Sequence, residues 1–149
     1  MGCEMQLKTQ SRTEGGIIMK KLIIYRCPIC GNMAVMLEHS GVNPFCCGKP
    51  MQMLHANKED ASFEKHTPVV TQLGKDVYIK VGEDAHPMTE DHSILWIALL
   101  TDRGLYTRML RKSDLPEAHF LINTDEDVTA AYAYCNLHGL WVKEQPRHR

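Results

Sequence analysis

Four cysteines in the first third of the chain constrain its fold more than any other feature. Cys27, Cys30, Cys46 and Cys47 follow the spacing Cys-x2-Cys-x15-Cys-Cys. They lie in a block of about 35 residues, which is too small to fold on a hydrophobic core alone and needs a staple. Four thiolates suit a tetrahedral zinc or iron ion. Two structural disulfides and a purely structural zinc site are the alternatives.

The residues next to these cysteines indicate tight turns. Gly31 and Gly48 directly follow the two pairs, where a tight turn lets backbone N–H groups point at sulfur. Cys46 and Cys47 are adjacent, and the side chains of neighbouring residues diverge. Both can bind one ion only through a distorted turn, so we expect one sulfur–metal–sulfur angle to be opened relative to a regular tetrahedron.

The rest of the chain has an all-β pattern without a long helical period. Short apolar or alternating runs are separated by turn signals rich in Gly, Asp and Asn, as in a β-sandwich or barrel. The runs that we expect to form strands are 21–25 and 33–37 in the cysteine block, followed by 69–70, 77–81, 94–100, 105–110, 128–134 and 140–142.

Composition sets the domain organisation and excludes several classes of protein. We expect an extension without regular structure at 1–18, a small module at 19–54, a polar linker at 55–62 and a β domain at 63–149. A net charge of −1 gives no basic face for nucleic acid. No apolar run approaches the roughly 20 residues that span a bilayer. Without a secretory pattern at the N-terminus, we expect a cytoplasmic protein with reduced cysteines.

A second set of candidate metal ligands lies in the β domain. Imidazole suits iron, zinc, copper and nickel, and thiolate is a soft, strongly donating ligand. Four imidazoles and one thiolate leave a sixth octahedral position open, as a catalytic metal requires. Ligand type alone leaves the metal undecided, and a buried inert thiol beside a surface histidine is the alternative for the last two residues. The candidates are His66, His86, His92, Cys135 and His138.

Three separated motifs resemble those of the superoxide reductase family. They are Glu64-Lys65-His66-x-Pro68, His86-Pro87-Met88-x3-His92-x-Ile94-x-Trp96-Ile97, and Cys135-Asn136-x-His138-Gly139-x-Trp141. The cysteine block is similar to the desulforedoxin module, including the closing Cys-Cys-Gly-x-Pro-Met. From about residue 20 to 142 the chain thus resembles the two-iron form of the family, the desulfoferrodoxins.

The resemblance implies a desulforedoxin-like iron module followed by an immunoglobulin-like β-sandwich. It implies two non-haem irons per chain, one held by Cys27, Cys30, Cys46 and Cys47. The second would be held by His66, His86, His92 and His138 in a plane, with Cys135 as the axial ligand. The implied activity is superoxide reductase, the one-electron reduction of superoxide to hydrogen peroxide. A small redox protein such as rubredoxin is the implied donor, and the implied assembly is a homodimer.

Two residues next to His66 are candidates for catalytic roles. Lys65 would attract the superoxide anion and handle protons, because a cation near an open metal raises the local anion concentration. In the family the residue matching Glu64 occupies the sixth position of the resting ferric ion. We also expect Asn136 and nearby backbone N–H groups to donate hydrogen bonds to the Cys135 sulfur.

Other functions remain open at this stage. A non-enzymatic iron electron carrier would use the four-cysteine site as its working centre. A zinc-binding structural protein would close both sites at four ligands. A superoxide dismutase would need superoxide itself to reduce the metal again, whereas a site supplied by an external donor gives net reduction.

Overall fold

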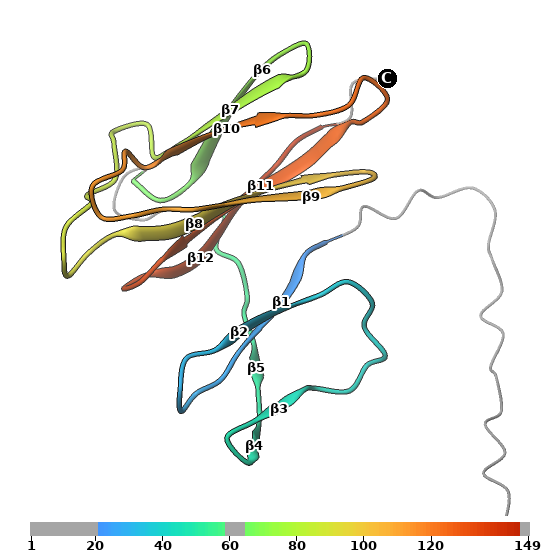
Figure 1. The fold of residues 1–149 in the computed structure, drawn as a ribbon, viewed down its shortest axis with the longest axis vertical. Helices are drawn as coiled ribbons and strands as arrows, with labels where there is room; N and C mark the ends of the chain where they lie inside the picture. Colours follow the sequence, from blue (N-terminus) through green and yellow to red (C-terminus); the bar gives the residue numbers. More distant parts are fainter. Residues whose placement is uncertain (1–20, 59–64, 147–149) are drawn as a thin grey trace, which may run out of the picture.

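The computed structural model describes residues 21–58 and 65–146, and these residues form twelve β-strands and no helix. They accordingly include no helix of the length and apolarity that a membrane crossing needs. The all-β prediction is therefore confirmed for this part of the chain. The expected extension at 1–18 lies outside the described residues. Figure 1 shows a small module built from β1–β5 lying against a two-sheet sandwich built from β6–β12.

The module contains one three-stranded sheet and one very short hairpin. The sheet has the order β2-β1-β5, and all its pairings are antiparallel. Its core is small and consists of the buried residues Tyr25, Cys27 and Met51. The strands are β1 (Ile23–Arg26), β2 (Met33–Met36) and β5 (Gln52–Met53), with the hairpin strands β3 (Phe45–Cys46) and β4 (Lys49–Pro50).

The sandwich has one sheet of three strands and one of four, as the sequence predicts for a β-sandwich. Both sheets are antiparallel. The first has the order β10-β7-β6, with β6 (Pro68–Leu73), β7 (Asp76–Val81) and β10 (Glu117–Leu121). The second has the order β12-β11-β8-β9, with β8 (Ile94–Thr101), β9 (Leu105–Met109), β11 (Val128–Cys135) and β12 (Gly139–Glu144).

Strand β7 shows why these segments form a sandwich. Val77, Ile79 and Val81 are fully buried in the core, while Tyr78 and Lys80 on the other face are exposed. Successive side chains of a strand point to opposite faces, so this alternation places one apolar face against the second sheet.

Strand β11 differs because all eight of its residues are buried. One face contributes Ala131, Ala133 and Cys135 to the core between the two sheets. The opposite face contributes Tyr132 and Tyr134 to a second cluster that includes residues of the module. The four-stranded sheet is therefore covered on both faces.

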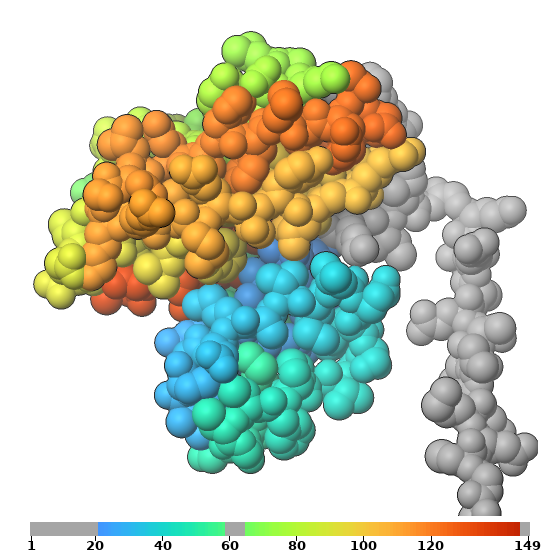
Figure 2. Space-filling model, viewed as in Figure 1, coloured from blue at the N-terminus to red at the C-terminus, as the bar shows by residue number. Residues whose placement is uncertain are grey.

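The contact between module and sandwich is apolar and also hydrogen-bonded. Ile24 of β1 is fully buried in the second cluster, and the backbone N–H of Leu22 donates to the hydroxyl of Tyr132 at 3.3 Å. Asn57 forms a parallel bridge to Trp141 of β12. The first part of the expected linker thus lies along the sandwich, and residues 59–62 lie outside the described part. Figure 2 shows the module packed closely beneath the sandwich.

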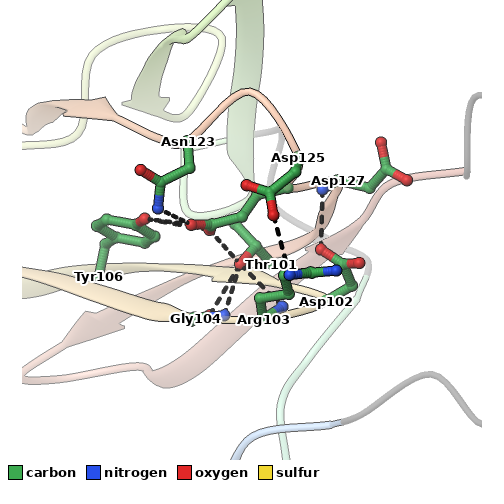
Figure 3. A network of polar contacts seen from close by, with 9 residues as sticks. Thr101, Asp102, Arg103, Gly104, Tyr106, Asn123, Asp125 and Asp127 are labelled. Carbon is green, nitrogen blue, oxygen red and sulfur yellow. Dashed lines mark hydrogen bonds and ion pairs between the residues drawn. The ribbon is translucent and has the colours of Figure 1, made fainter.

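A buried carboxylate links two turns at one end of the sandwich. Glu126 is 9% exposed and accepts hydrogen bonds from Thr101 (2.7 Å), from the hydroxyl of Tyr106 (2.9 Å) and from the amide of Asn123. Thr101 in turn accepts the N–H of Gly104 at 2.7 Å. The turn between β8 and β9 is therefore connected to the loop before β11 (Figure 3).

We expect this carboxylate to make stability depend on pH. Its hydrogen bonds, above all the one from Thr101, lower the pKa of Glu126 below the ordinary value of 4.5. A depressed carboxyl pKa stabilises the folded state above about pH 4.5, and that stability is lost as pH falls further. Glu126→Gln should cost about 1–3 kcal/mol at neutral pH and flatten this acid dependence, as measured by urea unfolding from pH 7 to pH 3.

Asp125→Asn is the matched control for this experiment. Its carboxylate is 62% exposed and pairs with the exposed Arg103, so its removal should change the free energy of unfolding by less than about 0.5 kcal/mol. An unchanged acid slope in the Glu126→Gln variant would contradict the assignment.

Candidate metal centres

The four cysteines of the module meet at one point. Cys30 and Cys46 have sulfurs 3.6 Å apart, and the sulfurs of Cys46 and Cys47 are 3.9 Å apart. Metal–sulfur bonds of about 2.3 Å in a regular tetrahedron would separate the sulfurs by about 3.8 Å. The spacing therefore fits one tetrahedral ion. The five described cysteines are all free thiols, so no disulfide joins them.

The first cysteine pair lies in a turn whose backbone amides face a sulfur. The N–H groups of Ile29 and Cys30 donate to the sulfur of Cys27 at 3.4 and 3.5 Å. The N–H of Gly31 donates to the Cys27 carbonyl, and Gly31 has φ of 78°. The backbone N–H of Cys30 is the main cause that lowers the pKa of Cys27 to about 6. The turn thus stabilises a thiolate before any ion binds.

The second pair spans the last residue of β3, Cys46, and the first residue of the strained two-residue turn, Cys47-Gly48, that leads to β4. Cys47 has φ of 52° and Gly48 has φ of 73°, the left-handed geometry of a type I′ turn. Cys47 adopts it at a cost of roughly 1–2 kcal/mol. This is the distorted turn expected from the adjacent cysteines. The Cys46–Cys47 sulfur distance is also the longer of the two given above.

The thiols of the second pair resist ionisation in the absence of a cation. Contact with the other cysteine side chains, Cys30 first, raises the pKa of Cys47 to about 12 and also raises that of Cys46. Thiols this close cannot all become thiolates unless a positive ion neutralises them. The donor set therefore fits a metal ion.

The second group is a closed cycle of four imidazole rings. Neighbouring rings have centroids 4.5–4.9 Å apart and meet nearly edge-on, at interplanar angles of 68–77°. Across the cycle, His66 and His92 are 6.0 Å apart. The order around the cycle is His66, His86, His92 and His138. Such a cycle can direct one nitrogen of each ring toward a common centre.

Cys135 and His138 complete this group. The ligand atoms of His66, His86, His92 and Cys135 all lie within 4.8 Å of one another. His138 Nδ1 lies 2.9 Å from His66 Nε2 and 3.6 Å from the Cys135 sulfur. Two nitrogens at right angles, each about 2.05 Å from a metal, would be about 2.9 Å apart. His138 therefore belongs with the other four residues.

The five residues come from segments far apart in the sequence that meet at one end of the sandwich. His66 precedes β6, and His86 and His92 lie on the loop between β7 and β8. Cys135 ends β11, and His138 lies in the turn before β12. The long antiparallel pairing of β11 with β8 brings Cys135 opposite Ile94, two residues after His92.

Two of the imidazoles present unpartnered nitrogens. His86 Nε2 and His92 Nε2 are buried and have no hydrogen-bond partner among the residues that the structure describes. His86 Nδ1 lies 2.7 Å from the Pro87 carbonyl. Donation to that oxygen leaves the Nε2 lone pair free for a metal. Burial lowers the pKa of His86 to about 4 and is the main cause lowering that of His92. Both rings are therefore neutral near pH 7, and the group fits a metal.

The group has a buried side and a solvent side. Cys135 is 0% exposed, and His66 and His86 are also buried. His92 is partly exposed and His138 is exposed. Solvent therefore reaches His92 and His138, while the sulfur of Cys135 is shielded from it.

The two candidate catalytic residues fall on either side of the boundary of the described part. Lys65 is exposed and directly precedes His66, a member of the imidazole cycle. After burial and the neighbouring imidazoles, its charge also contributes to the lowered pKa of His92. Glu64 lies outside the described residues.

Asn136 holds the loop of His92 against the turn of Cys135. Its carbonyl oxygen accepts the N–H of Ser93 at 2.9 Å, and its amide nitrogen donates to the Asp91 carbonyl at 2.9 Å. The amide nitrogen is thus engaged away from the sulfur, contrary to our expectation from the sequence. Only the carbonyl oxygen approaches the Cys135 sulfur, at 4.0 Å. Asn136 positions ligands, a role that its local sequence does not reveal.

We expect Asn136→Ala to weaken metal binding at the imidazole group by about tenfold, because residues that orient ligands typically contribute 10–100-fold in metal affinity. Competition with a chelator measures this, while the four-cysteine group in the same sample should keep its affinity. Leu137→Ala, which removes a side chain from the adjacent 60% exposed position, is the control. Equal affinities in both variants would contradict the positioning role.

Comparisons with known proteins agree with both halves of the chain. The family described as Desulfoferrodoxin matches residues 58–144, and Desulfoferrodoxin, N-terminal domain, matches residues 19–54. Desulfoferrodoxin from Syntrophotalea carbinolica is 42% identical over 125 residues, which are 84% of this chain and 98% of that protein. A desulfoferrodoxin homolog from Archaeoglobus fulgidus is 40% identical over 118 residues, 79% of this chain and 93% of that protein.

A solved structure has the same arrangement. The superoxide reductase from Treponema pallidum superposes with a TM-score of 0.74 at 32% identity, covering 83% of this chain and 98% of that chain. The desulfoferrodoxin family has two iron centres, and this chain has two groups able to hold a metal. With both family descriptions and relatives above 40% identity along most of its length, the chain belongs to the desulfoferrodoxin family.

Proposed function

We propose that this chain is a superoxide reductase. It would convert superoxide, one electron and two protons into hydrogen peroxide, with an external donor supplying the electron. The observation that carries the proposal is the imidazole group with one buried thiol, in which Cys135 is 0% exposed while His92 and His138 reach solvent. A site closed at four ligands would leave no such approach.

The residues that would hold the catalytic iron are His66, His86, His92, His138 and Cys135. Iron at this site would supply the electron that superoxide accepts, and the electron-rich thiolate ligand favours that donation. The chain's own part is to keep the imidazoles neutral, which burial achieves for His86, and to exclude water from the sulfur. Relatives and structural neighbours that carry the name superoxide reductase support this reaction.

Lys65 would act on the substrate as a cation. It is exposed and close enough for its charge to affect the pKa of His92. A cation at this place raises the local concentration of an anionic substrate and its association rate. Its ammonium group would also hold the water that delivers a proton.

Glu64 would have the opposite effect on access to the site. A carboxylate favours the harder ferric state, so Glu64 would occupy the sixth position of the oxidised iron. Because Glu64 directly precedes Lys65 and His66, a small backbone movement would exchange the carboxylate for the ammonium group.

The module would hold the second iron with Cys27, Cys30, Cys46 and Cys47. Cys30 and Cys47 are exposed, which suits exchange of electrons with another protein. We propose that the donor is a small redox protein such as rubredoxin, in the cytoplasm. The module also exposes large apolar side chains, which would support a homodimer: Ile29, Leu37, Val42 and Phe45 are each more than half exposed.

Anaerobic stopped-flow mixing of the reduced, iron-loaded protein with superoxide tests the proposed reaction. We expect one hydrogen peroxide per superoxide consumed and no oxygen released. Half an oxygen per superoxide would instead identify a dismutase. No reaction at the imidazole iron, together with oxidation of the four-cysteine iron by a partner protein, would identify an electron carrier.

Lys65→Ala should lower the second-order rate constant for superoxide by about tenfold and weaken its dependence on ionic strength, because the steering charge is lost. Lys65→Arg should retain most of the rate. Lys75→Ala is the control, since Lys75 is an exposed lysine in the turn that follows β6, at the end of that strand away from His66. If Lys65→Ala and the Lys75→Ala control had equal rate constants, the proposed role of Lys65 in attracting superoxide would be wrong.

A further inference from the structure

The indole of Trp141 lies flat against one of the proposed iron ligands. Its ring and the imidazole of His66 have centroids 4.8 Å apart and an interplanar angle of 18°. Every neighbouring pair in the imidazole cycle meets nearly edge-on. Among the described residues, this is the one stacked ring contact that a member of the cycle makes.

Trp141 is held rigidly by the sheet on both sides of its strand. It is 7% exposed and pairs with Ala133 of β11 on one side. On the other side, the N–H of Asn57 donates to the Leu140 carbonyl at 2.9 Å, and the N–H of Val142 donates to the Asn57 carbonyl at 3.0 Å. The indole therefore has little freedom to move with the ring that it touches.

The buried indole N–H indicates that Trp141 does more than fill space in the core. Trp141 Nε1 is buried and has no hydrogen-bond partner within 21–58 and 65–146. A buried N–H without a partner costs roughly 1–3 kcal/mol, which a phenylalanine at this position would avoid. The large indole face remains the feature that sets Trp141 apart.

We propose that Trp141 is a positioning residue that fixes the plane of His66 for the metal. A ring packed flat on a rigid surface can slide in its own plane but cannot tilt out of it. The coordinating lone pair lies in the imidazole plane, so the stack aims it at the centre of the cycle. The proposal rests on the metal ligation proposed above and does not depend on the reaction with superoxide.

The stack should also tune the metal electronically. The indole face carries negative charge density, and an imidazole bound to a cation becomes more positive. The interaction therefore favours the more highly charged state of the metal. Loss of the indole should shift the midpoint potential of iron at this site upward.

Co(II) titration of the full metal-free chain tests the positioning role. Co(II) held by four thiolates and Co(II) held by imidazoles with one thiolate have different spectra, so both sites are followed in one sample. We expect Trp141→Leu to lower Co(II) affinity at the imidazole site by about tenfold and to alter its spectrum. Trp141→Phe, which retains a stacking ring, should remain within about threefold of the wild type. Affinity at the four-cysteine site should not change.

Trp96→Leu is the matched control. Trp96 also stacks on an aromatic ring of the same sheet, Tyr134, at 5.7 Å and 10°, but it makes no ring contact with the described histidines of the cycle. Its loss should lower stability while leaving the imidazole-site spectrum and the iron midpoint potential at wild-type values. If Trp96→Leu changed the imidazole-site spectrum and the iron midpoint potential as much as Trp141→Leu does, the effect would come from general packing of the sheet. That result would overturn the proposal.

Three further outcomes decide the question. Wild-type affinity and spectrum in Trp141→Leu would overturn the positioning role alone. A Trp141→Phe variant as weak as Trp141→Leu would overturn stacking as its basis. If the wild-type chain bound Co(II) only at the four-cysteine site, the proposed ligation by the imidazoles and the inference about Trp141 would both be wrong.

Discussion

Burial of β11 on both faces is the constraint on which the rest of the structure depends. One face packs into the core between the sheets and ends in the buried sulfur of Cys135. The other face packs against the module through Tyr132 and Tyr134. Small residues such as Ala131 and Ala133 let the neighbouring layers approach closely. A single strand therefore contributes residues to the core of the sandwich, to the cluster shared with the module and to the imidazole group, and it runs through the middle of the sandwich above the module (Figure 1).

This arrangement gives the two metal groups different surroundings. The module directs two backbone N–H groups at the sulfur of Cys27 and leaves Cys30 and Cys47 exposed. The sandwich buries the sulfur of Cys135 and exposes His138. Under the proposed function, the exposed thiolates would suit exchange of electrons with a partner, and the solvent-reaching imidazoles would leave a bound metal accessible to a small anion. The difference follows from which side of each group the polypeptide covers.

Local patterns in the sequence were sufficient for the features that depend on neighbouring residues. The Cys-x2-Cys spacing and the adjacent Cys46 and Cys47 predicted the module and its strained turn, because those constraints act within a few residues. The apolar run at 77–81 predicted the strand β7. The grouping of His66 with Cys135 came from a resemblance to a family, since no local pattern connects residues so far apart.

Features that depend on long-range pairing could not be predicted. The eight buried residues of β11 do not alternate, because a separate module covers the second face. Asn136 was expected to face the sulfur, but its partners Ser93 and Asp91 are more than 40 residues away. Nothing in the local sequence singles out Glu126, because its partners Thr101 and Tyr106 lie on β8 and β9, about 20 residues or more away (Figure 3).

The central claim is that the imidazole group and Cys135 hold a second iron, distinct from the iron of the module. Metal analysis of the anaerobically purified full chain, combined with visible absorption of the wild type and Cys135→Ser, tests it most directly. The account predicts two irons per wild-type chain, with a thiolate-to-iron band that Cys135→Ser loses while the four-cysteine band remains. Zinc in both sites, or a spectrum that Cys135→Ser leaves unchanged, would contradict it.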